Sequence, residues 1–230
     1  MTRLSGQERA TYVQNMFTLI AKRYDLMNRW MTGGQDIRWR KRVIKLARLN
    51  QDSYLLDIGT GTGDLAREAI TQFPQAKVIA TDFTLEMMRV GQIKGLLNFS
   101  SADALCLPFQ DASFDAVVSG FLMRNVIDLQ KALQEQYRVL KSGGWIVILD
   151  TTRPKKNILS PLIGLHMHVV IPIMGRLLTG VKEAYHYLPE TTDGFVTAEE
   201  MASRIMAVGF KNVNYQRLMF GVIAIHWGAK

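Results

Sequence analysis

The sequence predicts an α/β domain with a mostly parallel, doubly wound sheet. Short apolar runs of strand length alternate with longer helical segments, which is the pattern of βαβ units. The apolar run 54–56 leads directly into a loop with glycine at every second position, Gly59, Gly61 and Gly63. Because ligands of such domains bind at the carboxyl ends of the strands, this loop marks the expected binding site.

Two basic helices are expected before the first strand. Apolar residues recur at steps of three and four along 7–31, Gly33 and Gly34 stop that helix, and a second helix follows at 36–49. Residues 1–48 hold eleven Lys and Arg against three Asp and Glu, which accounts for the whole net charge of +8. Such a segment attracts nucleic acid, an anionic membrane or an acidic substrate, or is only a solvated face.

The remaining elements follow in βα order and end in an antiparallel hairpin. We expect strands at 54–57, 77–82, 96–101, 114–119 and 145–149, helices at 64–73, 84–93 and 129–140, a turn at 141–144, and finally a helix at 198–208 with strands at 212–218 and 222–227. These elements are expected to form one domain with N-terminal helices (1–49), a core (50–152), a helical insert or lid (153–196) and a C-terminal helix with hairpin (197–230).

The uncharged stretch 157–175 is long enough to be a candidate membrane span. Pro161 and Pro172 interrupt it, together with glycines and histidines, so we expect instead a helical insert that covers the active site and contacts lipid. No secretory signal is expected. The single cysteine, Cys106, excludes an internal disulfide, fits a reducing compartment and is expected to pack in the interior.

The loop that follows Asp57 distinguishes between classes of nucleotide ligand. A dinucleotide fingerprint would place its third glycine at position 64, where this chain has Asp64, and the observed spacing is D-x-G-x-G-x-G. That spacing resembles the first motif of class I S-adenosylmethionine (SAM) methyltransferases. The alternative is a glycine turn with a purely structural role.

A second acidic residue follows the next expected strand. Asp82 ends the run 77–82 and precedes Phe83. A carboxylate at that position can accept hydrogen bonds from both hydroxyls of a ribose. Its alternative role is to cap the helix expected at 84–93. The position after a buried strand favours the ribose interpretation.

Asp103 and Ala104 follow the third expected strand, where a SAM enzyme binds the adenine ring. A carboxylate there can accept a hydrogen bond from the exocyclic amine, and the adjacent backbone N–H can reach the ring. The alternative is an aspartate in a surface turn.

Arg124 and Asn125 follow the fourth expected strand among apolar neighbours. Because an unpaired buried charge is costly, Arg124 must either face a ligand or form an ion pair. Asp128 and Asp150 are the candidate partners for such a structural pair.

Together these motifs resemble the ubiquinone/menaquinone biosynthesis C-methyltransferase family over nearly the whole chain. The most specific signatures are Tyr24-Asp25 and Arg124-Asn125, and other shared segments lie at 61–64, 107–115, 137–144, 185–188 and 221–226. The chain departs from the usual family pattern at Gly120, where serine is usual, at Leu122, where glycine is common, and at Asp150-Thr151, where Glu-Phe is usual.

The resemblance implies a class I SAM-methyltransferase fold, with a seven-stranded sheet and SAM as the cofactor, which leaves as S-adenosylhomocysteine. The residues expected to bind the cofactor are Asp57, Gly59, Gly61, Thr62, Gly63, Asp82, Phe83, Asp103, Ala104 and Gly120. The residues expected to contact the acceptor are Tyr24, Phe121, His166 and Tyr185.

The implied reaction is transfer of the SAM methyl group to a ring carbon of a prenylated quinol, most directly demethylmenaquinol to menaquinol. The carbon is a poor nucleophile until a ring hydroxyl, with a pKa of about 10, loses its proton. Arg124 is the candidate for stabilising the phenolate, and Asn125 for orienting the hydroxyl or a water. His166 and His168 are candidate bases, or core or interface residues. The reaction needs no metal.

Two rival functions stay open. One is SAM-dependent methylation of another lipid-like or small acceptor, such as a phospholipid amine or a sterol. The other is a basic nucleic-acid-binding protein, against which the basic helices lack exposed aromatic residues. We therefore expect no nucleic-acid partner and a cytoplasmic protein with peripheral contact at the inner face of the membrane. The sequence does not specify an oligomeric state.

Overall fold

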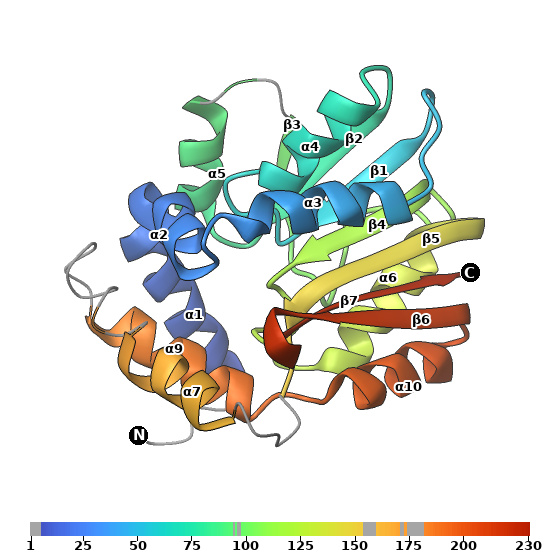
Figure 1. The fold of residues 1–230 in the computed structure, drawn as a ribbon. Helices are drawn as coiled ribbons and strands as arrows, with labels where there is room; N and C mark the ends of the chain where they lie inside the picture. Colours follow the sequence, from blue (N-terminus) through green and yellow to red (C-terminus); the bar gives the residue numbers. More distant parts are fainter. Residues whose placement is uncertain (1–5, 94, 96–97, 154–159, 171–172, 174–181) are drawn as a thin grey trace.

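The computed structural model describes residues 6–93, 95, 98–153, 160–170, 173 and 182–230, and its centre is a seven-stranded sheet (Figure 1). The strand order is β3-β2-β1-β4-β5-β7-β6. The strands are β1 (Tyr54–Ile58), β2 (Lys77–Asp82), β3 (Asn98–Ser101), β4 (Phe114–Gly120), β5 (Leu140–Thr151), β6 (Lys211–Leu218) and β7 (Ile223–Ala229).

Strands β1 to β5 run parallel, whereas β7 is antiparallel to its neighbours β5 and β6. This topology confirms the expected doubly wound sheet with an antiparallel hairpin at its end. The strand β6 therefore points in the same direction as β5, and its carboxyl end lies at the same edge of the sheet. The central strands are apolar along nearly their whole length because helices cover both of their faces.

Helices form a layer on each face of the sheet and a group at its carboxyl edge. They are α1 (Gly6–Ile20), η1 (Ala21–Arg23), α2 (Tyr24–Met31), α3 (Gln35–Leu46), α4 (Asp64–Gln72), α5 (Leu85–Ile93), α6 (Leu129–Val139), α7 (Ser160–Leu165), η2 (His166–Val170), α9 (Lys182–Asp193), α10 (Ala198–Val208) and η3 (Met219–Gly221).

The alternating side chains of the strands build two separate cores. On one face, Val43 and Ile44 of α3 and Leu65 of α4 pack on strand residues such as Leu55. On the other face, side chains of α6 and α10 pack on strand residues such as Leu56. Each large apolar side chain buried in this way contributes roughly 1.5–3 kcal/mol to the hydrophobic term of folding. The two cores hold the strand ends, and hence the loops after them, in fixed positions.

Two predicted elements differ from the structure. The helix expected along 7–31 is divided, because the 3-10 turn η1 separates α1 from α2. The turn expected at 141–144 is part of β5, where a register shift against β4 accommodates the extra residues and Gly143 takes a φ of +79°. The first difference matters for the site, because the break falls directly before Tyr24, the first residue of α2.

The helices α1, α2, α7 and α9 gather beyond the carboxyl ends of the strands (Figure 1, left). The residues Met16, Ile20 and Met27 are buried there, packed with Val222 from the start of the last hairpin strand. None of the helices in the described ranges combines the length and apolar character needed to cross a bilayer. The division of the chain into core, insert and terminal parts stays a prediction, and residues 154–159, 171–172 and 174–181 of the insert 153–196 fall outside the described residues.

Candidate active site

A cavity opens at the carboxyl ends of β1, β2, β3 and β4. The loops after these strands form one wall, and the inner face of α1 forms the other. The cavity is lined by Gln7, Ala10, Val13, Gln14, Phe17, Tyr24, Ile58, Gly59, Gly61, Asp82, Phe83, Thr84, Met87, Ala102, Asp103, Ala104, Leu105, Gly120, Phe121, Leu122, Asn125, Val126 and Ile127. It therefore brings together most of the predicted cofactor and acceptor residues.

The glycine loop after β1 is required by its surroundings. Gly59 has a φ of +64°, and a Cβ there would lie 2.8 Å from Cδ1 of Leu122. Gly61 has a φ of +58°, and its Cβ would lie 3.1 Å from Cε of Met87. Positive φ and close approach both exclude a side chain, so the loop offers bare backbone to the cavity.

Asp57 organises this loop from behind and does not line the cavity. Its Oδ2 accepts hydrogen bonds from the Thr60 hydroxyl (2.6 Å) and from the backbone N–H of Ala66 in α4 (3.1 Å). Burial raises the pKa of this carboxyl from 3.8 to about 7, although both hydrogen bonds act in the opposite direction. Asp57 thus joins the strand, the loop and the first turn of the helix, and cofactor contact by Asp57 stays a prediction.

Asp82 lies in the cavity and holds the two neighbouring loops. Its Oδ2 accepts from the backbone N–H of Gly61 (2.8 Å), and its Oδ1 accepts from the N–H of Thr84 (2.7 Å). Burial raises the pKa of Asp82, and these hydrogen bonds lower it. Asp82 thus orders the turn that leads into α5, but Thr84 and not Asp82 occupies the position directly before the helix, so the capping alternative does not hold in its simple form. Carboxylate oxygens accept more than one hydrogen bond, so the ribose role stays compatible with this position.

Thr62 is turned away from the cavity. Its side chain is 1% exposed, and its hydroxyl donates a hydrogen bond of 2.6 Å to Oδ1 of Asp25 in α2. The guanidinium of Arg67 donates to the Thr62 carbonyl. Neither Thr62 nor Gly63 lines the cavity, so the predicted contact of these residues with SAM stays a prediction. The contact observed here connects the N-terminal helices to the cofactor loop.

A second connection joins α3 to the same loop through charge. The guanidinium of Arg40 lies 2.9 Å from Oδ2 of Asp36 and 2.6 Å from Oδ2 of Asp64, the first residue of α4. The Asp36 side chain is fully buried, and that of Arg40 is 11% exposed. Arg40 is therefore a structural cation, although the sequence suggests a basic surface.

Asp103 and Ala104 line the cavity after β3, with Phe83 opposite them after β2. The Asp103 Oδ1 accepts a hydrogen bond of 2.9 Å from the N–H of Leu105, which is the geometry of an Asx turn. Ala104 is 8% exposed, and Phe83 is 41% exposed. Asp103 therefore forms the surface-type turn and also lines the cavity. Its recognition of adenine stays a prediction.

Arg124 is paired with Asp150, the second of the two candidate partners. Its Nη1 lies 2.7 Å from Oδ1 of Asp150, and its backbone N–H donates to Oδ2 at 3.2 Å. Both side chains are buried. Asp128 instead caps α6, where it accepts from the N–H of Lys131. Arg124 does not line the cavity, so the structural ion-pair alternative is the one that the geometry supports.

Asn125, the next residue, faces the cavity. Its amide donates to the carbonyl of Phe121 (3.0 Å), and its Oδ1 accepts from the Tyr187 hydroxyl of α9 (3.2 Å). Phe121 also lines the cavity and has a φ of +59°, a strained conformation for a residue with a side chain. Gly120 before it would bring a Cβ within 3.0 Å of Leu65. The turn after β4 is thus tightly constrained and presents an amide to the cavity.

Tyr24 contributes a hydroxyl from the first residue of α2. Burial raises the pKa of Tyr24 above its ordinary value of 10.0, while a hydrogen bond with Asn28 and the charge of Arg124 partly lower it. The hydroxyl therefore stays protonated at neutral pH and is available as a hydrogen-bond donor.

The helix α1 is tied to two of the loops by long-range contacts. Nε2 of Gln14 donates to the carbonyl of Phe83 (3.0 Å), and Nη2 of Arg9 donates to the carbonyl of Arg124 (2.7 Å). The partners lie 69 and 115 residues apart in the chain. Sequence reasoning missed both contacts because nothing local to either residue indicates the distant partner. Asp25 could have been found from the sequence, because it belongs to the Tyr24-Asp25 signature.

The remaining predicted residues are His166, Tyr185, His168 and Cys106. His166 lies in η2 and Tyr185 in α9, but their side chains are outside the described part of the structure. His168 is half exposed and lies 3.2 Å from Asp193. The prediction that Cys106 packs in the interior is wrong, because it lies exposed in the loop after β3. Among the described side chains, no group of three or more His, Cys, Asp or Glu could hold a metal ion.

Comparison with known sequences identifies the family. The model of the ubiE/COQ5 methyltransferase family matches residues 4–230. A ubiquinone/menaquinone biosynthesis C-methyltransferase from Desulfotalea psychrophila is 42% identical over 95% of this chain and 90% of its own length. A demethylmenaquinone methyltransferase from Thermus thermophilus is 43% identical over 93% of this chain and 99% of its own length.

Comparison with solved structures supports the fold. A SAM-dependent methyltransferase from Thermotoga maritima has a TM-score of 0.65 at 18% identity, over 94% of this chain and 99% of that one. A phosphoethanolamine N-methyltransferase from Haemonchus contortus, solved with SAM, has a TM-score of 0.66 at 15% identity, over 89% of this chain and 56% of that one. At these identities the likeness shows a shared fold.

Proposed function

Because this chain belongs to the ubiE/COQ5 methyltransferase family, we propose that it transfers the methyl group of SAM to a ring carbon of a demethylated prenylated quinol, with demethylmenaquinol as the preferred acceptor. The observation that carries the proposal is identity above 40% over almost the full length of relatives named for this chemistry. The cavity supports it, because a polar end at the glycine loop adjoins the apolar side chains Ala10, Val13 and Phe17 of α1.

The residues around the glycine loop fit a SAM molecule. Gly59 and Gly61 form a cradle that a Cβ would fill, Asp82 places a carboxylate beside it, and Asp103 with Ala104 lies across the cavity. When bound, SAM supplies an electrophilic methyl group on a cationic sulfur. We propose that Asp82 binds the ribose and that Asp103 with Ala104 binds the adenine. The proposed reaction uses no metal.

The protein must also help the acceptor to lose a phenolic proton or to carry the resulting charge. Asn125 and Tyr24 are the polar groups that face the cavity on the acceptor side, so we propose that they contact the ring hydroxyl. Direct contact of the Arg124 guanidinium with the acceptor would require it to turn away from Asp150. A positioning role requires no movement, because the ion pair already fixes the turn that presents Asn125.

Methylation with deuterated-methyl SAM tests the function. Purified protein is given demethylmenaquinol, a demethylated benzoquinol and phosphoethanolamine in parallel, and the products are identified by mass and by NMR of the methylated position. We expect ring C-methylation, fastest with the naphthoquinol. The benzoquinol is the second candidate, because one relative is named for both quinone pathways. Transfer to nitrogen or oxygen only, or no transfer to either quinol, would contradict the proposal.

The proposed substrate also has a consequence for location. A prenylated quinol is held in a bilayer, so the enzyme must reach it at the membrane surface. We therefore propose that the enzyme works in the cytoplasm with peripheral contact at the inner face of the membrane.

A further inference from the structure

We infer that an amphipathic surface on α1, η1 and α2 docks this protein on an anionic lipid bilayer. Five exposed side chains define this surface, which we call the outer face: Leu19, Lys22, Arg23, Leu26 and Trp30. Leu26 and Trp30 are four residues apart and share one side of α2, and Leu19, Lys22 and Arg23 lie directly before α2 at the end of α1 and in η1. Leu19 is 68% exposed, Leu26 50% and Trp30 58%. The expectation that the basic helices lack an exposed aromatic residue is therefore wrong at Trp30.

The opposite side of the same segment is already occupied. Met16, Ile20 and Met27 are buried, and Phe17 and Tyr24 line the cavity. The segment therefore has apolar residues on both sides, and only the inner ones pack on this chain. Exposing a tryptophan and two leucines together on a free surface is unfavourable, which indicates a partner for the outer face.

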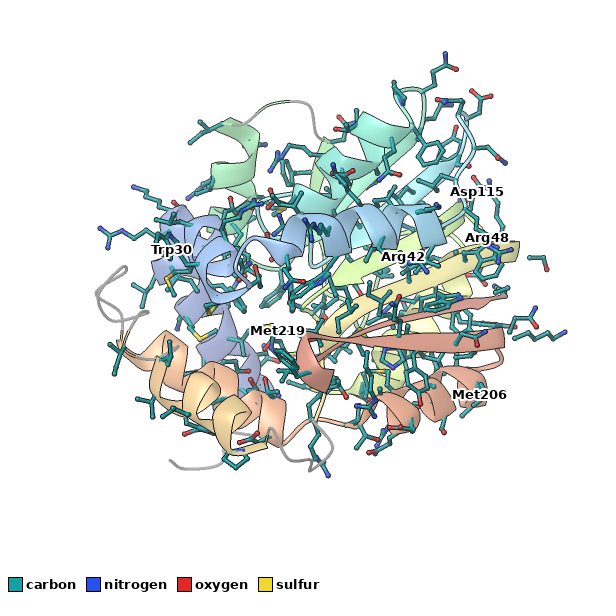
Figure 2. All side chains as sticks on the ribbon, viewed as in Figure 1. Trp30, Arg42, Arg48, Asp115, Met206 and Met219 are labelled. Carbon is teal, nitrogen blue, oxygen red and sulfur yellow. The ribbon has the colours of Figure 1, made fainter. Side chains whose placement is uncertain are left out.

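Exposed apolar side chains concentrate at this end of the molecule. Of the fifteen large ones in the described ranges, eight lie on α1, α2, α7 and η2 or in the connecting segments after the carboxyl ends of β2, β4 and β6: Leu19, Leu26, Trp30, Leu165, Val169, Phe83, Ile127 and Phe220. In Figure 2 the labelled Trp30 projects from this end, at the left, whereas Met206 lies at the opposite side. A bilayer would bury such an end as a whole, whereas a small ligand would cover only one side chain.

The charges on the outer face determine which kind of bilayer fits. Lys22 and Arg23 are exposed between Leu19 and Leu26, so basic groups and apolar groups share one surface. This combination is typical of helices that lie in the interface of membranes with anionic headgroups. The surface charge of the lipid and that of the protein are thus complementary.

The basic helix α3 is less suited to this role. Arg40 already forms ion pairs with Asp36 and Asp64. Arg42 lies along the flank of the sheet, and Arg48 lies farther from the carboxyl edge (Figure 2), where its guanidinium stacks 3.8 Å from the Trp145 ring centroid. Lys22 and Arg23 lie on the outer face itself, between Leu19 and Leu26, so the electrostatic contribution to docking is assigned to them by position.

The outer face also stands in a useful relation to the cavity. One layer of helix separates them, since Phe17 and Tyr24 on the inner side belong to the same segment as Leu19 and Leu26. Docking by the outer face would place the cavity next to the lipid surface. This part of the argument rests on the proposed function, because only a membrane-held acceptor makes that position useful.

Vesicle binding without substrate tests the inference. The full chain is sedimented with vesicles of phosphatidylcholine alone or mixed equally with phosphatidylglycerol. Lys22→Glu with Arg23→Glu should lower the partition coefficient on anionic vesicles by at least about tenfold, because each basic group near the surface changes binding about fivefold and two are reversed. The matched reversal Lys41→Glu with Arg42→Glu on α3 should change it by less than about twofold.

The apolar half is tested separately. Trp30→Asp should also weaken binding at least about tenfold, whereas Met206→Asp, an equally exposed position on α10, should not. Trp30 fluorescence, obtained by subtracting the spectrum of Trp30→Phe, should shift to the blue on anionic vesicles, which requires no destabilising variant. All of these variants should methylate a short-tailed, water-soluble quinol at the wild-type rate, so a failure of the proposed function would be seen independently.

Three results would overturn the inference. The first is equal partition onto neutral and anionic vesicles. The second is equal loss of binding in the outer-face and control variants, or an unshifted Trp30 spectrum. The third is a dimer in solution that Trp30→Asp dissociates, with no vesicle binding by the wild type, which would assign the outer face to a second copy of the chain.

Discussion

The cofactor loops after β1 and β2 and the helical cap over them, formed by α1 and α2, are held in place by different kinds of contact. In the loops, each key contact joins a carboxylate to nearby backbone, as Asp57 does with Ala66 and Asp82 with Gly61 and Thr84. In the cap, single side chains reach distant parts of the chain, as Arg9 reaches the Arg124 carbonyl across 115 residues. One region is specified by backbone geometry and the other by side-chain tethers.

This difference has a functional meaning. Backbone conformation tolerates few substitutions, which suits a site for an invariant cofactor. Side-chain tethers can be exchanged one at a time, which suits a wall that must match an acceptor. We therefore expect mutations in the loops to weaken cofactor binding. We expect mutations in the cap to change which acceptor is methylated or how well the cofactor loops are ordered.

The largest effect should come from Arg124, where the two regions meet. Arg124→Met leaves the buried Asp150 carboxylate without its cation and should cost about 3–5 kcal/mol in the free energy of unfolding, measured with urea. Asp150→Asn in the same protein should recover much of that loss. If Arg124→Met keeps wild-type stability but loses turnover, Arg124 acts on the reacting ring and not by positioning Asn125.

The cofactor loop should respond to pH through Asp57. Its pKa in the folded protein, about 7, is above its ordinary value of 3.8, so the folded state holds the proton more tightly. The resulting stabilisation is fully present below about pH 4 and is lost as the pH rises through 7, up to about 4 kcal/mol in all. Asp57→Asn removes this titration.

The measurement is urea unfolding of wild type and Asp57→Asn between pH 5 and pH 8. We expect the wild type to lose stability relative to the variant as the pH rises. Parallel curves for the two proteins would show that the Asp57 carboxyl is ionised in the folded state at all of these pH values.

A single methyl group should distinguish a constrained glycine from a free one. Gly59→Ala adds a Cβ 2.8 Å from Leu122 at a φ of +64° and should cost about 2–4 kcal/mol in stability, together with most of the SAM affinity. Gly143→Ala is the matched control, because its φ is +79° but no atom lies within 4 Å of the new Cβ. It should cost about 1–2 kcal/mol with SAM affinity unchanged. Similar SAM affinities in both variants would refute the cradle.

A smaller effect is expected where the cap touches the loop. Asp25→Ala removes the partly buried acceptor of the Thr62 hydroxyl and should weaken SAM binding by about 1–2 kcal/mol in calorimetry, because the loop loses an ordering contact. Glu8→Ala removes an exposed carboxylate from the same cap and should have no effect. An Asp25→Ala protein with wild-type affinity would mean that the loop is ordered without the cap.

The same contrast explains what could be predicted from the sequence. The strands and their order follow from apolar periodicity, and Asp82 could be found because it ends a recognisable strand. These are local signals. The roles of Arg124 and Thr62 could not be settled, because their partners, Asp150 and Asp25, lie 26 and 37 residues away. The break at η1 was missed because the apolar spacing of 7–31 continues through it.

The charge pattern shows the same limit. The excess of basic residues before residue 49 is visible in the sequence. The sequence does not show which of these residues form ion pairs and which are exposed. Only the structure separates Arg40, which is consumed by two carboxylates, from Lys22 and Arg23, which are exposed beside Leu26. Counting charge along a chain therefore identifies a basic segment without identifying which of its residues can meet a partner.

The most direct test of the central claim is SAM affinity by calorimetry in Asp82→Ala and Asn125→Ala, each paired with its rate of demethylmenaquinol methylation. The account predicts that Asp82→Ala weakens SAM binding by about 1.5–3 kcal/mol, as for a lost charge-assisted hydrogen bond. It predicts that Asn125→Ala binds SAM like the wild type but methylates the quinol at least tenfold more slowly. Unchanged affinity in a folded Asp82→Ala protein, or lost affinity in Asn125→Ala, would contradict the division between a cofactor side and an acceptor side.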